Sequence, residues 1–471
     1  MSTKKVSHPS IGERIALGKD ARTRTPLSDH EGWKPQADRS DPIALLDDQN
    51  TTREPDLVPV RHGRMMVSAF TFFRGAAKIM AADLKATPTA GLNVQLCGDA
   101  HLSNFGVFAS PERTLLFGLN DFDETLPGPF EYDVKRLAAS FAIAARNNGF
   151  SSDGAEAATS KCVKAYREAM AAFAKMRTMD IWYAHLSATE ILETARRAAK
   201  NKRAAKDERR GKKVIEKART RDSLQALSKL AEMVDGRYRV VSQPPIVVPM
   251  RDLGAYYDVS PDEIEQAIHE QFRAYRATLP EDRRHLLERF EVVDMARKVV
   301  GVGSVGTRAF IVLLRGRDEH DPLFLQVKEA TASVLEDHLP KSRYRQPGER
   351  VVQGQRLMQA ASDIYLGWTK GVQADRFFYW RQLRDMKGSP DVEDMSPDAL
   401  SFYAGLCGWT LARAHARSGD PIAIAKYLGK KDAFDRSITD FAKRYADQND
   451  RDYTAFLDAV RSGKLESREG V

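Results

Sequence analysis

A glycine-rich turn between two β-prone runs constrains the fold of this chain more than any other feature. Residues 290–315 are β-prone on both sides of the turn Gly301-Val302-Gly303-Ser304-Val305-Gly306, and a further β-prone run follows at 321–330. This pattern predicts antiparallel strands joined by a tight connection. Apolar residues recur at helical spacing elsewhere, as at 131–150 and from 348 onward. Separate β-rich and helical regions predict the α+β class.

Length and composition set the broad class of the protein. The 471 residues are enough for two or three packed units. The apolar fraction of 42% and the charged fraction of 29% are typical of soluble proteins, and no stretch reaches the roughly 18–20 apolar residues of a membrane span. The first twenty residues are charged and lack the apolar region of a secretory signal. We therefore expect a cytoplasmic protein without a membrane partner.

Cysteine spacing and charge distribution narrow the function classes. Cys97, Cys162 and Cys407 are far apart and have no partner at metal-ligand spacing, so neither a disulfide framework nor a zinc site is indicated. The formal net charge of +8 comes mainly from residues 191–221, which contain thirteen Lys or Arg and four acidic residues. The basic stretch 196–221 could contact nucleic acid. It lacks interleaved aromatic residues, which favours an exposed helix face or a surface excursion.

Two acidic loops follow short strand-like segments. Asp99 and Asn104 lie five positions apart, and we interpret Asp99 as the group that orients an acceptor hydroxyl and accepts its proton in phosphoryl transfer. Asn104 is then a magnesium ligand. Asp121, at the end of the next apolar strand, is the expected second ligand, and Asp123 could assist with metal or acceptor. His101 fits a structural imidazole better than a catalytic base.

The glycine-rich turn has the composition of a nucleotide-binding loop, because glycines let backbone amides approach a triphosphate closely. The residues expected to bind the nucleotide are Gly301, Gly303, Ser304 and Gly306. Lys328 lies among apolar residues on the next strand and is expected to hold ATP phosphates, with a solvent-facing edge-strand lysine as the alternative. Glu349, which opens a helical pattern, is the candidate partner of Lys328, and Glu336 is its competitor.

Three motifs resemble a known group of enzymes. The segment Cys97-Gly98-Asp99-Ala100-His101-Leu102-Ser103-Asn104 resembles the His-Gly-Asp-x-His-x-x-Asn loop of aminoglycoside- and choline-kinase-type phosphotransferases, with Cys97 in place of the first His. Asn120-Asp121-Phe122-Asp123 resembles their Ile-Asp-Phe/Trp metal motif. Tyr132-Asp133 resembles the pair that opens the helix beneath their catalytic loop. Residues 60–460 as a whole are similar to DUF2252, a bacterial family of unknown function grouped with the kinase-like fold. The resemblance implies ATP and Mg²⁺ as cofactors.

The order of these motifs is inverted relative to kinases, in which the glycine loop and the lysine come first. A circularly permuted, protein-kinase-like fold with two lobes explains the inversion, and it requires Lys328 to lie near Asp121. The predicted parts are a polar N-terminal arm, extended or poorly ordered, at 1–55, a large-lobe part with the catalytic loop and the metal Asp at 56–285, a small β-rich nucleotide-binding lobe at 286–388, and a helical part that completes the large lobe at 389–471.

The leading hypothesis is an ATP- and magnesium-dependent phosphotransferase that acts on an unidentified hydroxyl of a small molecule or protein. Nucleotidyl transfer (AMPylation) by the same site stays open, as does a nucleotide-binding or nucleic-acid-associated regulator without turnover. Arg74 and His415 are polar residues among apolar neighbours. Structural salt bridging is the simpler interpretation of each, although either could reach the acceptor pocket.

Overall fold

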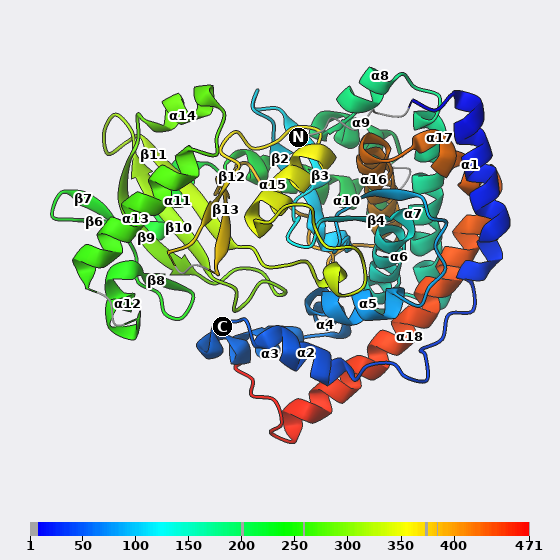
Figure 1. Ribbon diagram of the computed structural model, residues 1–471, viewed down its shortest axis with the longest axis horizontal. Helices are drawn as coiled ribbons and strands as arrows, with labels where there is room; N and C mark the ends of the chain where they lie inside the picture. Colours follow the sequence, from blue (N-terminus) through cyan, green and yellow to red (C-terminus); the bar gives the residue numbers. More distant parts are fainter. Residues whose placement is uncertain (1–7, 199–201, 258–259, 373–374, 384, 471) are drawn as a thin grey trace.

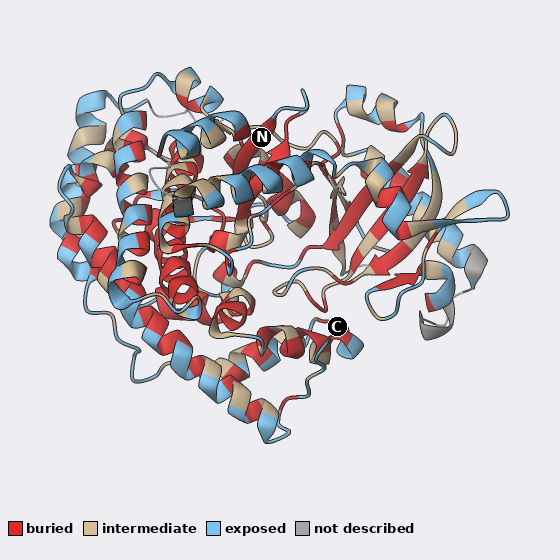
Figure 2. Ribbon diagram, turned by 180° about the vertical axis from the view of Figure 1, so that it is seen from behind, coloured by how far each residue is buried: buried red, intermediate tan, exposed pale blue. Residues whose placement is uncertain are grey.

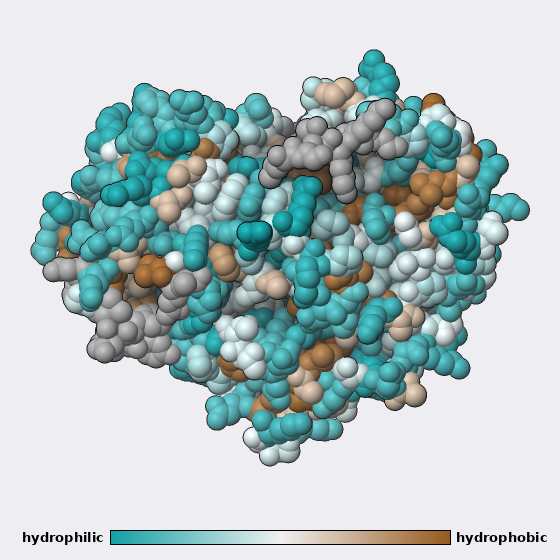
Figure 3. Space-filling view, in the orientation of Figure 1, coloured by the Kyte–Doolittle hydropathy of each residue, from teal (hydrophilic) through white to brown (hydrophobic). Residues whose placement is uncertain are grey.

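The computed structural model describes residues 8–198, 202–257, 260–372, 375–383 and 385–470. They form a β-rich lobe and a helical lobe that lie side by side (Figure 1). The mixture of helices and strands confirms the expected α+β class. None of the helices in these ranges combines the length and the apolarity that a membrane crossing needs. The face seen in Figure 3 is mostly hydrophilic, with small apolar patches scattered over it.

The β-rich lobe is built on one antiparallel sheet of six strands in the order β12-β13-β11-β10-β9-β8. The strands are β8 (Val247–Pro249), β9 (Glu291–Lys298), β10 (Ala309–Arg315), β11 (Pro322–Glu329), β12 (Gly367–Lys370) and β13 (Phe377–Gln382). Successive residues of β10 enter opposite cores: Val312 joins one apolar cluster and Leu313 the other. This alternation is the two-residue period of a strand whose sheet is covered on both faces. The sheet is therefore buried where β10 and β11 pair.

Helices surround this sheet. Those on and around the β-rich lobe are α11 (Ser223–Leu230), α12 (Met250–Tyr257), α13 (Pro261–Arg276), α14 (Glu281–Leu287) and α15 (Pro347–Met358). Tyr275 of α13 stacks on Trp380 of β13, with ring centroids 4.5 Å apart. A small hairpin of β6 (Ala231–Val234) and β7 (Arg237–Val240) projects from the lobe (Figure 1).

The helical lobe has a buried centre made of α6 (Phe130–Asn147), α7 (Ser152–Phe173), α16 (Pro397–Ser418) and α18 (Ala433–Arg461). Figure 2 shows that the faces these helices turn toward each other are buried. In α6 every residue from Phe130 to Ala145 is buried, so the helix has no solvent-facing stripe. Gly408 of α16 lies against the Cys162 carbonyl of α7, where any Cβ would collide. Close packing of this kind makes the lobe a rigid support.

The remaining elements of the helical lobe deliver the loops. Strands β1 (Asn93–Leu96) and β4 (Leu126–Pro129) pair with each other, as do β2 (Phe105–Ala109) and β3 (Leu115–Leu119), with β5 (Leu186–Ser187) beside β3. The helices are α1 (Ile11–Arg24), α2 (Pro42–Asn50), α3 (Val58–Met65), α4 (Ala69–Gly75), α5 (Ala77–Leu84), α8 (Thr178–Tyr183), α9 (Ala188–Ala198), α10 (Lys202–Arg219) and α17 (Pro421–Leu428). Short 3₁₀ helices are η1 (Leu27–His30), η2 (Pro55–Leu57), η3 (Leu102–Asn104) and η4 (Val334–Asp337).

The structure differs from the expectation of an extended or poorly ordered N-terminal arm. Within residues 8–55 it contains α1 and α2, and both begin at capping side chains: Ser10 with Glu13 in a capping box, and Asp41 on the Ile43 amide. Gly18 of α1 packs so closely on the Ala423 carbonyl of α17 that a Cβ would lie 2.3 Å from it. These helices carry few apolar residues, and tertiary contacts rather than their own periodicity stabilise them.

Candidate functional site

A cavity of about 390 Å³ lies where the two lobes meet, and both lobes line it. Among its lining residues are Asp99, Asn104, Asp121, Asp123, Gly301, Gly303 and Ser304, together with Arg53, Arg74 and Glu124. Segments that are far apart in the sequence, from residues 48–53 to 329–337, therefore converge on one space. Most of the predicted site residues lie at this cavity, and Lys328 lies directly beside it.

The loop that carries Asp99 and Asn104 is held from beneath by α6. Asp133, in the first turn of this helix, accepts hydrogen bonds from the amides of Cys97 (2.6 Å) and Gly98 (3.0 Å). The same carboxylate lies 3.2 Å from His415 Nε2, and Tyr166 contacts the other ring nitrogen of His415 at 2.9 Å. His415 is fully buried here. It therefore has the structural role that the sequence favoured, and it lies behind the loop rather than in the pocket.

Asp99 faces the cavity with its carboxylate fixed on one side. Arg136 of α6 donates to Oδ1 from Nε at 2.7 Å, and its terminal nitrogen lies 2.6 Å from the same oxygen. Burial raises the pKa of Asp99, and Arg136 acts against that increase. The side-chain amide of Asn104 donates a hydrogen bond from Nδ2 to the backbone carbonyl of Asp99 at 2.6 Å, which closes the loop on itself. His101 Nε2 is 3.7 Å from Asp99, and burial holds the pKa of this imidazole well below its usual range. His101 lines the cavity, and its buried Nδ1 has no hydrogen-bond partner among the described residues.

Lys328 of β11 reaches across to the second acidic loop. Its ammonium lies 2.5 Å from Asp123 Oδ2 and 3.8 Å from Asp121 Oδ1, although about two hundred residues separate them. Tyr379 of β13 donates to the other oxygen of Asp123 at 2.7 Å. Burial alone would raise the pKa of Asp123, but Lys328 and Tyr379 outweigh it and lower the value. Burial and the neighbouring Asp123 raise the pKa of Asp121.

The glycine loop connects β9 to β10 and covers the cavity. Gly301 and Gly306 have φ values of +67° and +89°, a left-handed backbone that only glycine adopts without strain. Ser304 Oγ lies 3.4 Å from Asp123 Oδ2, and a Cβ at Gly303 would lie 3.1 Å from the Arg74 carbonyl. The tip of the loop therefore contacts both the acidic loop and α4.

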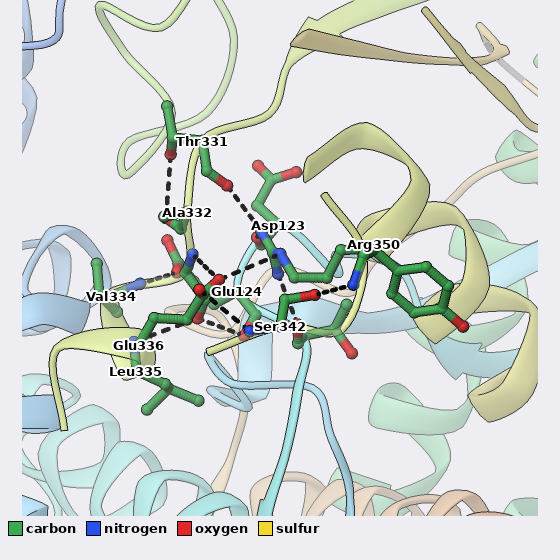
Figure 4. A network of polar contacts seen from close by, with 12 residues as sticks. Asp123, Glu124, Thr331, Ala332, Val334, Leu335, Glu336, Ser342 and Arg350 are labelled. Atoms are coloured by element: carbon green, nitrogen blue, oxygen red, sulfur yellow. Dashed lines mark hydrogen bonds and ion pairs between the residues drawn. The ribbon is translucent and has the colours of Figure 1, made fainter. Parts of the chain in front are cut away.

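Neither glutamate considered as a partner of Lys328 contacts it among the described residues. Glu336 accepts from the amides of Ser333 (3.1 Å) and Ser342 (3.2 Å), and Figure 4 shows it in a network with Glu124 and Arg350. The backbone of Glu349 is capped by Gln346. Arg350, the next residue of α15, donates to the Asp123 and Thr125 carbonyls at 2.7 and 2.6 Å. The acidic partner of Lys328 is therefore Asp123 and neither of the two glutamates that we expected.

Helices α9 and α10 carry the basic stretch on the surface of the helical lobe. Ile215 and Ala218 of α10 are buried, whereas Arg203, Lys206 and Arg209 are exposed. The described part of the stretch is thus an exposed helix face, as the absence of interleaved aromatic residues suggested.

Sequence reasoning missed several residues of the site. Two of them hold the acids of the site: Tyr379 contacts Asp123, and Arg136 contacts Asp99. The third, Arg53, lines the cavity. The sequence around each is apolar or simply polar and does not indicate a functional site. A polar residue inside an otherwise apolar run was the available signal for Tyr379 and Arg136. For Arg74 we favoured structural salt bridging and kept the acceptor pocket as the alternative; the structure places Arg74 in the cavity wall, with no ion pair among the described residues.

Comparisons with known proteins are consistent with the sequence resemblance at the level of family. A family model described as "Uncharacterized protein conserved in bacteria (DUF2252)" matches residues 53–459. Searches of curated proteins and of solved structures gave no match. The matched range contains the loop with Asp99 and Asn104, both acidic residues of the second loop, the glycine loop and Lys328.

Proposed function

The chain belongs to the DUF2252 family of bacterial proteins, and we propose from the geometry of its site that it is an ATP- and magnesium-dependent phosphotransferase. One observation carries the proposal. Lys328 of the β-rich lobe lies within 4 Å of both Asp121 and Asp123 of the helical lobe, at a cavity that Asp99 and the glycine loop also line. A cation, two acids and a glycine loop around one space are the parts that phosphoryl transfer uses.

The order of parts in the β-rich lobe supports a kinase-like arrangement. The glycine loop joins the first two long strands, Lys328 is on the third, a helix (α15) follows, and two more strands complete the sheet. Protein kinases have the same succession of glycine loop, strand lysine and helix. Here it comes after the Asp99 loop in the sequence, which is the order that a circular permutation would produce.

The residues present fit a magnesium ion. Asp121 Oδ1 is buried and has no hydrogen-bond donor among the described residues, and Asn104 lines the same cavity. The described residues contain no cluster of three or more His, Cys, Asp or Glu side chains arranged around a metal position. Two or three oxygen ligands suit Mg²⁺, since phosphates and water complete its shell. When bound, the ion would neutralise charge on the phosphates, with Asn104, Asp121 and Asp123 holding it.

The remaining steps belong to side chains of the cavity. Lys328 and the amides of the glycine loop hold the phosphates in line with the acceptor. The acceptor hydroxyl donates its proton to Asp99 as its oxygen forms a bond to the γ-phosphorus. The bond from that phosphorus to the β,γ-bridging oxygen breaks, and ADP leaves. Arg136 keeps the Asp99 carboxylate oriented toward the acceptor.

Calorimetry of nucleotide binding tests this proposal. We expect the wild type to bind ATP in a magnesium-dependent way, Lys328→Ala to weaken binding about tenfold or more, and Asp121→Asn to lose the magnesium dependence. Lys370→Ala is the matched control, because Lys370 is an exposed lysine on β12 of the same sheet. A wild type that binds neither ATP nor GTP would refute the proposal.

A further inference from the structure

Three arginines near the cavity have no acidic partner. Arg53 and Arg61 are buried, 8% and 0% exposed, and Arg74 is half-buried. Among the described residues, none of the three has a carboxylate within 4.0 Å, and the Nε atom of each lacks a hydrogen-bond acceptor. Arg53 donates to the Val305 carbonyl, and Arg61 donates to the Asn50 and Gln49 side chains and the Gly75 carbonyl. These hydrogen bonds of Arg53 and Arg61 therefore go to neutral groups alone.

The other cations of the cavity are neutralised. Lys78 contacts Asp48 and lies 3.3 Å from Asp337, and Lys328 is held by Asp123. Arg136 is paired with Asp99. A buried charge without a counter-ion costs free energy. The cost shows in the pKa of Arg53, which burial lowers to about 10, and in that of Arg74, which burial lowers as well.

Arg53 and Arg74 both line the cavity, and both residues contact the glycine loop. A Cβ at Gly306 would lie 3.0 Å from the Arg53 Cβ, and one at Gly303 would lie 3.1 Å from the Arg74 carbonyl. The acids that act most strongly on the pKa of Arg74 include Asp99, whereas those that act on Arg53 include Glu124 and Asp123. Arg74 and Asp99 line the same cavity, and Arg53 donates to the Val305 carbonyl of the loop. Arg61, behind the wall, adds its charge to the same region.

We propose that Arg53 and Arg74 form an anion-binding pair that takes a phosphate or carboxylate group, in addition to the phosphates that Lys328 and the glycine loop hold. The assignment of this group to the reaction rests on the proposed phosphotransferase function. Its position beside Asp99 favours an anionic group of the acceptor, so the acceptor class is a hydroxyl compound that carries a phosphate or carboxylate. The terminal phosphate of a nucleotide bound in the reverse direction has the same chemistry, and the experiment separates these two sources.

Calorimetry with inorganic phosphate tests the pair directly. We expect the wild type to bind phosphate, and Arg53→Gln and Arg74→Gln each to weaken it about tenfold or more, as loss of a charge-assisted hydrogen bond does. Arg177→Gln is the control for a change of charge, because Arg177 is at the surface, paired only with Asp180. Arg53→Lys and Arg74→Lys retain the charge and should retain part of the affinity. Thermal unfolding of each variant shows that it is folded.

A second titration, with the magnesium complex of a non-hydrolysable ATP analogue, shows whether the bound anion belongs to the acceptor or to the nucleotide. If phosphate still binds when the analogue is present, and both Gln variants bind the analogue within about twofold of wild type, the anion belongs to the acceptor. If phosphate and analogue compete and both variants weaken the analogue, the pair holds the terminal phosphate of the nucleotide. Phosphate binding that is absent in the wild type, or unchanged in both Gln variants, overturns the anion site. If the analogue fails to bind but phosphate depends on Arg53 and Arg74, the anion site stands and the phosphotransferase proposal falls.

Discussion

The two loops that face each other across the cavity are supported in different ways. The proposed catalytic loop, residues 97–104 (below, the catalytic loop), is tied to the core: Asp133 accepts hydrogen bonds from two of its backbone amides, Ser140 accepts one from the Leu102 amide at 3.0 Å, and Tyr403 donates to the Leu102 carbonyl at 2.9 Å. All three side chains are buried. The glycine loop, residues 299–308, is held mainly through its carbonyls by one segment of chain.

The contacts of the glycine loop show the difference. Arg64 donates to the Gly301 carbonyl at 2.5 Å, Arg53 donates to the Val305 carbonyl, and the Glu54 amide donates to the Gly306 carbonyl at 2.7 Å. Val299 and Val305 of the loop pack on Leu57 and Val60 of that same segment, a much smaller apolar cluster than the core that contains α6. We infer that the catalytic loop is preorganised by the fold, whereas the position of the glycine loop is coupled to what occupies the cavity. Mutations in the catalytic loop should change the free energy of unfolding, and mutations in the glycine loop should change the affinity for nucleotide.

The largest effect is expected at Asp133. Asp133→Ala leaves two loop amides and His415 without their common acceptor. We therefore expect the free energy of unfolding to fall by about 3–5 kcal/mol and turnover to be lost. Urea unfolding measures the first and nucleotide-dependent activity the second. Asp133→Asn is the control, because its amide oxygen can still accept one of the loop N–H groups. An Asp133→Ala variant as stable as wild type would show that the catalytic loop does not depend on this support.

The next effect is expected at Gly306, whose φ of +89° and contact with Arg53 exclude a side chain. Gly306→Ala should cost about 1–2 kcal/mol, the penalty of a left-handed backbone for a residue with a Cβ. We expect that cost in the affinity for magnesium-ATP, measured by calorimetry, rather than in the unfolding transition. Gly211→Ala is the matched control, since a Cβ there meets open space on α10. A loss confined to stability would break the contrast between the loops.

The sequence predicted the parts of the site better than the contacts between them. The turn at 301–306, the acidic loop ends at Asp99 and Asp121, and the strand bearing Lys328 follow from local patterns of glycine and apolar residues. The proximity of Lys328 to Asp121 followed only from the permutation hypothesis, and the structure places the two side chains 3.8 Å apart. Local pattern could not choose among the acids near Lys328, because the partner is set by how the two lobes meet.

The N-terminal segment was the least predictable region for a related reason. The helices of residues 8–55 have too few apolar residues to show a helical period, so their stability comes from α17 and α18. That segment also contributes Arg53 to the cavity, and nothing in its own composition marks Arg53 as different from the arginines around it. Within this segment, Arg53 differs in being buried without a carboxylate partner among the described residues, and that is a property of the folded chain.

The smallest effect is expected at Ser304, and it tests the contrast most finely. Ser304→Ala removes a long, 3.4 Å contact with Asp123, so the unfolding midpoint should not change and the affinity for magnesium-ATP should fall by about threefold or less. The matched serine on the other side is Ser140 of α6, which supports the catalytic loop by accepting a hydrogen bond from the buried Leu102 amide. Because Ser140→Ala leaves that buried amide unpaired, it should cost about 1–3 kcal/mol of stability while nucleotide affinity is retained. If both serines changed the same quantity, stability or affinity, the two loops would not differ in how they are supported, and the glycine loop would have to be regarded as preorganised too.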